Sequence, residues 1–155
     1  MSTTTDGQIS YGHLFEDGYE FPWDDETDYD EPEDWWRDVK GFKSSLNPWT
    51  KEGDYADGWT REDPRLSAYY DERHKWINEN PLPFEQVNVQ SCDYPVYQLA
   101  VIGTTQTASR GYPAVFSPEL LSVNPKDEEI FLKFMSDYLP SEQPELNWLL
   151  SSYWG

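Results

Sequence analysis

Cysteine, histidine and basic side chains are scarce in this chain, and each shortage excludes a class of protein. A single cysteine, Cys92, excludes an intrachain disulfide framework and is typical of a reducing compartment. The two histidines, His13 and His74, lack the HExxH spacing of a zinc protease, and no matched set of zinc ligands can be assembled. Eleven Lys and Arg stand against thirty Asp and Glu, so the clustered bases needed to bind nucleic acid or an anionic membrane directly are missing.

Long apolar runs and phosphate-binding motifs are also missing. The longest apolar stretch, residues 97–102, has the length of a strand, whereas a membrane span needs about 18 residues. Met1 leads into STTTDGQ, which has neither the basic nor the apolar region of a secretory signal, so we expect a cytoplasmic protein. The chain contains no Gly-rich phosphate loop, no GxSxG and no kinase signature, and we predict that it is not an enzyme.

Aliphatic side chains are few as well. Leu, Ile, Val and Phe total thirty of 155 residues, about 19%, and with a net charge of −19 this composition is typical of disordered chains. Eight Trp and eleven Tyr lie outside that sum, and each ring can bury roughly 150–250 Å². We therefore predict a folded chain in which aromatic rings supply an unusual share of the core.

The hydrophobic periodicity predicts an α+β fold: a small mixed or antiparallel sheet with two to three helices and an acidic, irregular N-terminal third. We expect a single domain, 1–155, with a loose N-terminus and short strand (1–15), an acidic aromatic segment (16–41) and an α+β core (42–155). Helices are predicted over 33–39, 64–79 and 125–139, each with a proline at its start. Strands are predicted over 8–15, 84–91, 94–104, 112–116 and 147–155. We expect a hairpin-like or bulged connection near Asp93, a polar loop over 105–111 and a helical turn over 117–119.

Acidic residues are concentrated in the stretch EDGYEFPWDDETDYDEPEDWWRD, residues 16–38. It holds twelve carboxylates and one base, Arg37, and so carries net −11. Like charges at this density repel one another, so the segment must be held by other interactions. Interspersed rings supply apolar surface for that purpose. We expect Trp35 and Trp36 to pack on a helix, whereas Trp23 and Tyr29 could either pack or act as anchors in a partner.

A calcium-binding loop is the first alternative for so many acids. An EF-hand loop requires Gly at position 6 and Glu at position 12. Counted from Asp24 these positions are Tyr29 and Trp35, and counted from Glu26 they are Glu31 and Arg37. Neither register fits, so the sequence predicts no metal site and no cofactor.

Mimicry of nucleic acid is a second interpretation of the acidic segment. Duplex DNA presents about one negative charge per 1.7 Å of axis, and rows of Asp and Glu can occupy the same basic groove. We predict a non-catalytic acidic binding protein, a DNA-mimic inhibitor that occupies the nucleic-acid groove of a DNA-binding or nuclease partner. In size and charge the chain resembles the acidic DNA-mimic inhibitors that phages and plasmids use against restriction or CRISPR enzymes, which implies counter-defence. The predicted partner-binding residues are Glu16, Asp17, Glu20, Trp23, Asp24, Asp25, Glu26, Asp28, Tyr29, Asp30, Glu31, Glu33 and Asp34.

Other interpretations stay open. The acids could serve solubility alone, although a net charge of about 2–8 normally suffices for a small domain, and the excess is local: residues 1–38 carry net −12 and the rest −7. The chain could be an interaction or assembly module for a basic protein, with no effect on nucleic-acid binding. It could also be a small enzyme or a sugar-binding module that uses acidic and aromatic side chains.

Overall fold

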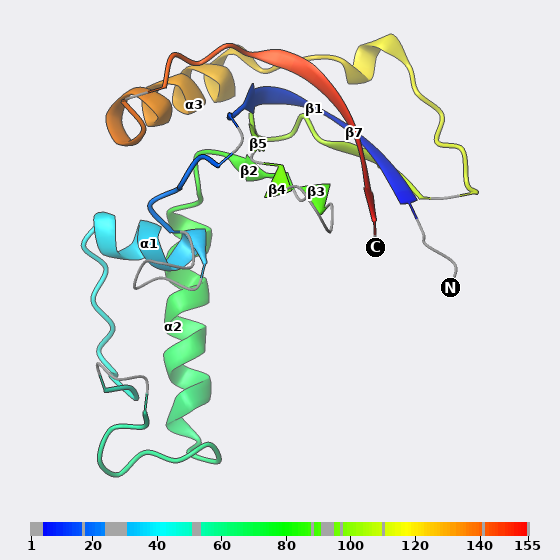
Figure 1. The fold of residues 1–155 in the computed structure, drawn as a ribbon. Helices are drawn as coiled ribbons and strands as arrows, with labels where there is room; N and C mark the ends of the chain where they lie inside the picture. Colours follow the sequence, from blue (N-terminus) through cyan, green and yellow to red (C-terminus); the bar gives the residue numbers. More distant parts are fainter. Residues whose placement is uncertain are drawn as a thin grey trace. The chain divides into compact units, whose positions relative to one another are not determined.

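The computed structural model of the protein describes residues 5–16, 18–23, 31–50, 54–87, 89–90, 95–96, 98–109, 111–140 and 142–154. The described residues contain three α-helices and a five-stranded antiparallel sheet, which confirms the α+β class (Figure 1). The chain groups into two compact units: a sheet unit, Met1–Tyr19 with Pro83–Gly155, and a helical unit, Glu20–Leu82. Most of the acidic segment therefore belongs with residues 42–82, and the single domain stays a prediction. Among the described helices, none combines the length and apolar character needed to cross a bilayer.

The sheet is organised around its longest strand, β1. Its strands are β1 (Thr5–Leu14), β2 (Glu85–Gln86), β5 (Gln98–Ala100), β6 (Gln106–Ala108) and β7 (Asn147–Trp154). β7 pairs antiparallel along one edge of β1, and the two strands run side by side (Figure 1). β6 and β5 pair with successive parts of the other edge, and β2 pairs with β5. The predicted C-terminal strand is confirmed, whereas residues 5–7, expected to be loose, belong to β1 because β7 pairs with them.

The predicted strand over 94–104 is wrong as one continuous element. β4 (Pro95–Val96) pairs antiparallel with β3 (Val89–Gln90), and β5 ends at Ala100. The connection expected near Asp93 lies outside the described residues. The chain turns after Val101, with Gly103 at a φ of 77°, and the Thr104 hydroxyl donates to Val101 O at 2.6 Å. These local hydrogen bonds end the strand although the apolar sequence continues.

The predicted strand over 112–116 is also wrong. That segment forms no strand, and Val115 is 92% exposed. β6 lies instead within the expected polar loop, where Gln106–Ala108 pairs with residues 7–9 of β1. The position of β6 is set by its backbone hydrogen bonds to β1. The segment lacks the apolar alternation from which a strand can be predicted in a sequence. The expected helical turn is confirmed as the 3-10 helix η1, Pro118–Leu120.

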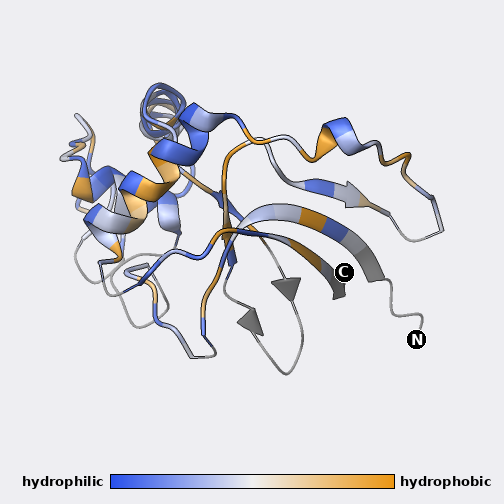
Figure 2. Ribbon diagram, turned by 90° about the horizontal axis from the view of Figure 1, so that it is seen from above, coloured by the Kyte–Doolittle hydropathy of each residue, from blue (hydrophilic) through white to orange (hydrophobic). Residues whose placement is uncertain are grey.

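Helix α3 (Pro125–Tyr138) follows the predicted start and stop signals. The Asn124 side chain accepts from Lys126 N at 3.0 Å, which caps the helix, and Pro140 follows its end. Its apolar side chains pack in the core of the sheet unit, where the Phe134 and Phe84 rings lie 4.8 Å apart. Figure 2 shows hydrophobic and hydrophilic stretches alternating along α3. Ile130, on the same helix, is exposed.

The helical unit contains α1 (Pro32–Val39) and α2 (Arg65–Glu79), both close to their predicted bounds. Asp63 Oδ1 accepts from Arg65 N at 2.9 Å at the start of α2. Between the helices the described residues form an irregular loop, in which the Trp49 and Tyr55 rings stack at 4.5 Å. The Trp36 indole N–H donates to Asn80 O at 3.2 Å and so links α1 to the end of α2.

Glu72 fixes this loop to α2. The Ser44 hydroxyl donates to Glu72 Oε2 at 2.7 Å, and Ser45 N donates to Oε1 at 3.1 Å. These bonds stabilise the charged carboxylate, the Ser44 bond most of all, and hold the pKa of Glu72 below its usual value.

The depressed pKa of Glu72 predicts acid sensitivity of the helical unit. The stabilisation is complete above the unfolded-state pKa, about 4.3, and is lost as the pH falls through the lower folded-state pKa. Glu72→Gln should therefore lower the free energy of unfolding at pH 7 and flatten its decline below about pH 4.3. Urea unfolding followed by tryptophan fluorescence measures both. Glu79→Gln, an exposed change on the same helix, should leave the free energy of unfolding at pH 7 close to that of the wild type. An equal free energy of unfolding at pH 7 for the two variants would refute the stabilising role of Glu72.

Candidate functional site

The described part of the acidic segment centres on α1. Pro32 is the first residue of the helix, and Glu33 and Asp34 lie in its first turn, where carboxylates interact favourably with the helix dipole. Gly41, at a φ of 72°, ends it: Gly41 N donates to Asp38 O and Phe42 N donates to Arg37 O, both at 2.8 Å. This is the pattern of a Schellman C-cap. Pro32 and Gly41 thus determine where α1, which carries these acids, begins and ends.

An aromatic cluster of Phe21, Trp23, Trp35 and Trp36 supports this helix. The Phe21 and Trp23 rings stack at 4.8 Å, and Trp23 lies 5.0 Å from Trp35. Trp36 lies 5.9 Å from Trp35, and all four side chains are buried. The sequence left open whether Trp23 packs or anchors a partner, and its side chain packs in the buried cluster. Trp35 and Trp36 pack as expected.

The cluster connects the two sides of the acidic run. Trp23 immediately precedes residues 24–30 in the sequence, and Trp35 follows them on α1. Because these two rings touch, the chain leaves and re-enters one buried cluster on either side of the most acidic residues. Burial of aromatic area thereby offsets the repulsion between carboxylates, as the sequence required.

Asp34 is neutralised within the helical unit. Its Oδ1 accepts from Arg37 Nη1 at 2.5 Å and also from Arg73 Nη2. Arg73 in turn donates to the Tyr69 hydroxyl at 3.0 Å. Burial lowers the pKa of both guanidinium groups, and nearby carboxylates, Glu33 for Arg37 and Glu31 for Arg73, act in the opposite direction. Asp34 therefore ties α1 to α2, unlike a freely presented charge.

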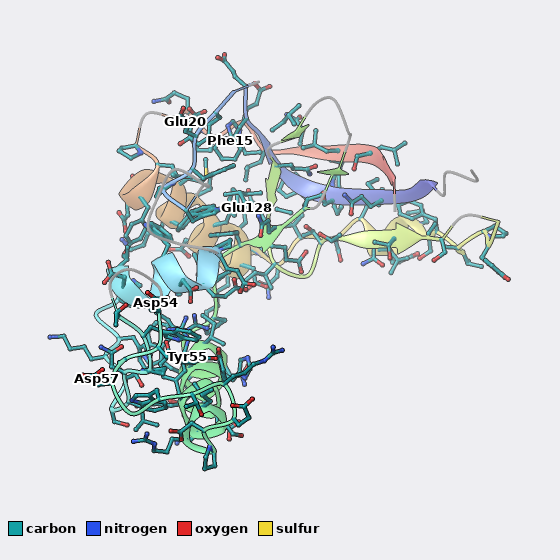
Figure 3. All side chains as sticks on the ribbon, turned by 60° about the horizontal axis from the view of Figure 1, so that its bottom comes forward. Phe15, Glu20, Asp54, Tyr55, Asp57 and Glu128 are labelled. Atoms are coloured by element: carbon teal, nitrogen blue, oxygen red, sulfur yellow. The ribbon has the colours of Figure 1, made fainter. Side chains whose placement is uncertain are left out.

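The other described acids of the predicted site face solvent. Glu16, in the sheet unit, is exposed, and so are Glu20 (Figure 3) and Glu31 in the helical unit. Glu33 is half-buried on α1. Within the described residues, none of the ion pairs uses any of these four carboxylates. Seven predicted site residues lie outside the described residues: Asp17, Asp24, Asp25, Glu26, Asp28, Tyr29 and Asp30.

Several bases of the helical unit are engaged by neighbours in the same unit. Arg65 is paired with Asp63 at 2.6 Å and lies over the Trp59 ring at 4.2 Å. The Lys40 ammonium lies over the Trp36 ring at 4.4 Å. Arg37 and Arg73 are paired with Asp34 in the same way. Eighteen carboxylates share the unit, including the exposed Asp54 and Asp57 beside Tyr55 (Figure 3), so it carries net −10.

The pairing of Asp34 with two arginines was not predicted from the sequence. The Asp34–Arg37 spacing of three residues on one helix was a usable signal. Arg73 gave no such signal, because it lies 39 residues away and only the packing of α1 on α2 brings it close. Among the described residues, no group of three or more His, Cys, Asp or Glu is arranged to hold a metal ion.

Comparison with protein-family models, with curated proteins and with solved structures finds no match to this chain.

Proposed function

We propose that this chain is a non-catalytic, cytoplasmic acidic protein that blocks the basic nucleic-acid groove of a DNA-binding or nuclease partner by mimicking DNA. The role is that of an inhibitor in phage- or plasmid-type counter-defence. Support comes from a net charge of −19, of which −11 falls within residues 16–38. A density of carboxylates this far beyond the needs of solubility favours a surface selected to present negative charge.

The contact between Trp23 and Trp35 carries the proposal. An acidic tail that serves only solubility needs no buried rings, whereas this segment is bounded by tryptophans that touch at 5.0 Å in a buried cluster. Carboxylates attached to a folded scaffold lose less conformational entropy on binding than those of a flexible tail. Acids attached to a buried aromatic cluster are therefore better suited to binding a defined complementary groove than to a general role in solubility.

The internal use of bases strengthens the same argument. Arg37, Arg65 and Arg73 are paired with carboxylates of their own unit. Glu20 and Glu31 remain exposed outside these ion pairs. A partner groove lined with Lys and Arg would supply the missing counter-charges, steer the encounter and release its own bound anions. The partner would consequently lose its ability to bind nucleic acid.

A pull-down from host lysate at low salt, with salt-stepped elution and mass spectrometry, identifies the partner. Recovery of one nuclease, helicase or repressor would support the proposal, and the purified partner should then lose DNA binding when this protein is added. The complex should weaken steeply between 50 and 500 mM salt, since exposed charges are screened within about 8 Å at physiological ionic strength. A mixture of basic proteins eluting together would contradict a specific partner.

Charge-neutral variants locate the binding surface. Changing Glu16, Glu20, Glu31 and Glu33 to Gln should weaken the complex by several kcal/mol in sum, on the order of 1 kcal/mol for each carboxylate. The same direction is expected for Asn at Asp24, Asp25, Asp28 and Asp30.

The matched control removes four charges outside the acidic segment, by amide substitutions at Asp54, Asp57, Glu62 and Asp71. All four are exposed in the helical unit, so the net charge changes equally. The control should retain most of the affinity, and calorimetry measures both sets. If both variants weaken binding equally, only total charge matters and the proposed surface is wrong.

A second candidate function, an assembly module for a basic protein, has its own observation. Residues 111–121 of the sheet unit expose Tyr112, Val115 and Phe116, and hydrophobic stretches border η1 (Figure 2). Clustered exposed apolar side chains often mark protein interfaces. Val115→Ser with Phe116→Ser would abolish such a complex while leaving a groove-blocking complex intact. The assembly function also predicts that the partner keeps its DNA binding.

A further inference from the structure

A cavity of about 330 Å³ lies in the helical unit beside Asp34. Arg37, Lys43 and Arg73 contribute cationic side chains to its lining, and Asp34 and Asp38 contribute carboxylates. The lining thus carries formal net +1 in a chain of net −19. The volume lies at the lower end of the range of roughly 300–1,000 Å³ found for small-molecule sites.

Arg37 is the most informative side chain of this cavity. It is only 9% exposed, and its Nη1 donates to Asp34 Oδ1 at 2.5 Å. Its Nε, buried from solvent, has no hydrogen-bond acceptor within the described part of the chain. Buried charged donors in folded proteins are nearly always paired, so the lack of an acceptor for this Nε among the described residues requires explanation. An anion in the cavity that Arg37 lines would supply it.

Arg73 adds a second guanidinium to the same wall. Arg37 and Arg73 both donate to one carboxylate oxygen, Oδ1 of Asp34, so a single negative charge faces two positive ones. Burial lowers the pKa of both arginines, and nearby carboxylates, Glu33 for Arg37 and Glu31 for Arg73, act in the opposite direction. A second carboxylate or phosphate group would relieve this imbalance through charge-assisted hydrogen bonds.

The remaining lining residues indicate the size and character of the ligand. Phe42 and Leu46 offer apolar surface, and Asn47 offers a neutral polar group. The charge of the whole chain opposes entry of a polyanion such as nucleic acid, because like charges repel over a Debye length. A small molecule with one anionic group is therefore the better match.

We propose that this cavity binds a small organic anion whose carboxylate or phosphate group accepts hydrogen bonds from Arg37 and Arg73, with its apolar part against Phe42 and Leu46. Lys43, exposed at the cavity, adds attraction for the same group. The inference does not rest on the proposed function, since it uses a cationic cavity and none of the exposed carboxylates, Glu16, Glu20 and Glu31, that are proposed to bind the partner.

NMR of the full chain tests this directly through the Nε–H signals of the arginines. Titration with phenyl phosphate or with benzoate should shift the Arg37 Nε–H signal in a saturable manner, and the two probes distinguish a phosphate from a carboxylate ligand. Inorganic phosphate should bind more weakly than phenyl phosphate, because it leaves the apolar wall uncovered. Benzyl alcohol, which lacks the charge, should not bind. Failure of both aromatic anions to shift the Arg37 signal would overturn the proposal.

Two variants distinguish binding of the anion in the cavity from a general attraction between opposite charges. Lys43→Gln should preserve the fold, since Lys43 is exposed, and should weaken binding of the anionic probe by up to about fivefold. Arg65→Gln removes a base of the same unit that is paired with Asp63 and does not line the cavity. It should leave the affinity unchanged. Equal loss in both variants would show that the probe responds to net charge and would refute the site.

Discussion

Replacing Gly12 by alanine should disrupt the sheet unit. A Cβ atom on Gly12 would lie 2.1 Å from Leu99 O and 2.7 Å from Ala100 Cα. Both are backbone atoms of β5, so no side-chain rotation can relieve the overlap. Leu99 and Ala100 are also completely buried, which leaves β5 no space to retreat. The expected loss is about 3 kcal/mol or more in the free energy of unfolding, at the upper end of the cost of overpacking.

Gly7→Ala provides the matched control for this prediction. Gly7 lies in the same strand, and no heavy atom lies within 4 Å of the position of its added Cβ. Alanine there should be neutral or stabilising by up to about 1 kcal/mol, because glycine loses more conformational entropy on folding. Urea unfolding followed by circular dichroism compares the two. An equal midpoint for Gly12→Ala and the wild type would show that β1 and β5 are less closely packed than described.

Replacing Trp35 by alanine should destabilise the helical unit by about 3–5 kcal/mol, the usual cost of removing a buried tryptophan. Trp35 is 6% exposed and contacts both Trp23 and Trp36, at 5.0 and 5.9 Å. Its loss leaves a cavity between the segment that precedes the acidic run and the helix that follows it. Unfolding in urea, followed by the fluorescence of the remaining tryptophans, measures the change.

Trp59→Ala is the control for Trp35. The Trp59 side chain is half-buried and contacts the Arg65 guanidinium at 4.2 Å, so its removal should cost about 1 kcal/mol. The pair also tests the proposed function, because neither substitution alters charge. If the aromatic cluster supports the acidic surface, Trp35→Ala weakens the complex with the basic partner more than Trp59→Ala does. Equal affinities would mean that the carboxylates bind without that support.

Local signals predicted the helices well. Pro32 with Gly41 bounds α1, and Asn124 with Pro140 bounds α3, because prolines and caps act within a few residues of themselves. The weak strands were predicted poorly. Gln106–Ala108 became β6 and residues 112–116 did not form a strand, since edge pairing depends on the neighbouring strand β1 and on little in the segment itself.

Residue types and their periodicity along the chain determined the α+β class, the reliance on aromatic rings and the concentration of charge in residues 16–38, because these depend on composition and short-range order. Only the tertiary structure decided which acidic and aromatic side chains remain at the surface. Trp23 became a core residue by meeting Trp35, and Asp34 became an internal counter-ion by meeting Arg73 from α2. These contacts join residues 12 and 39 positions apart, so they depend on how the chain packs, which no local spacing specifies.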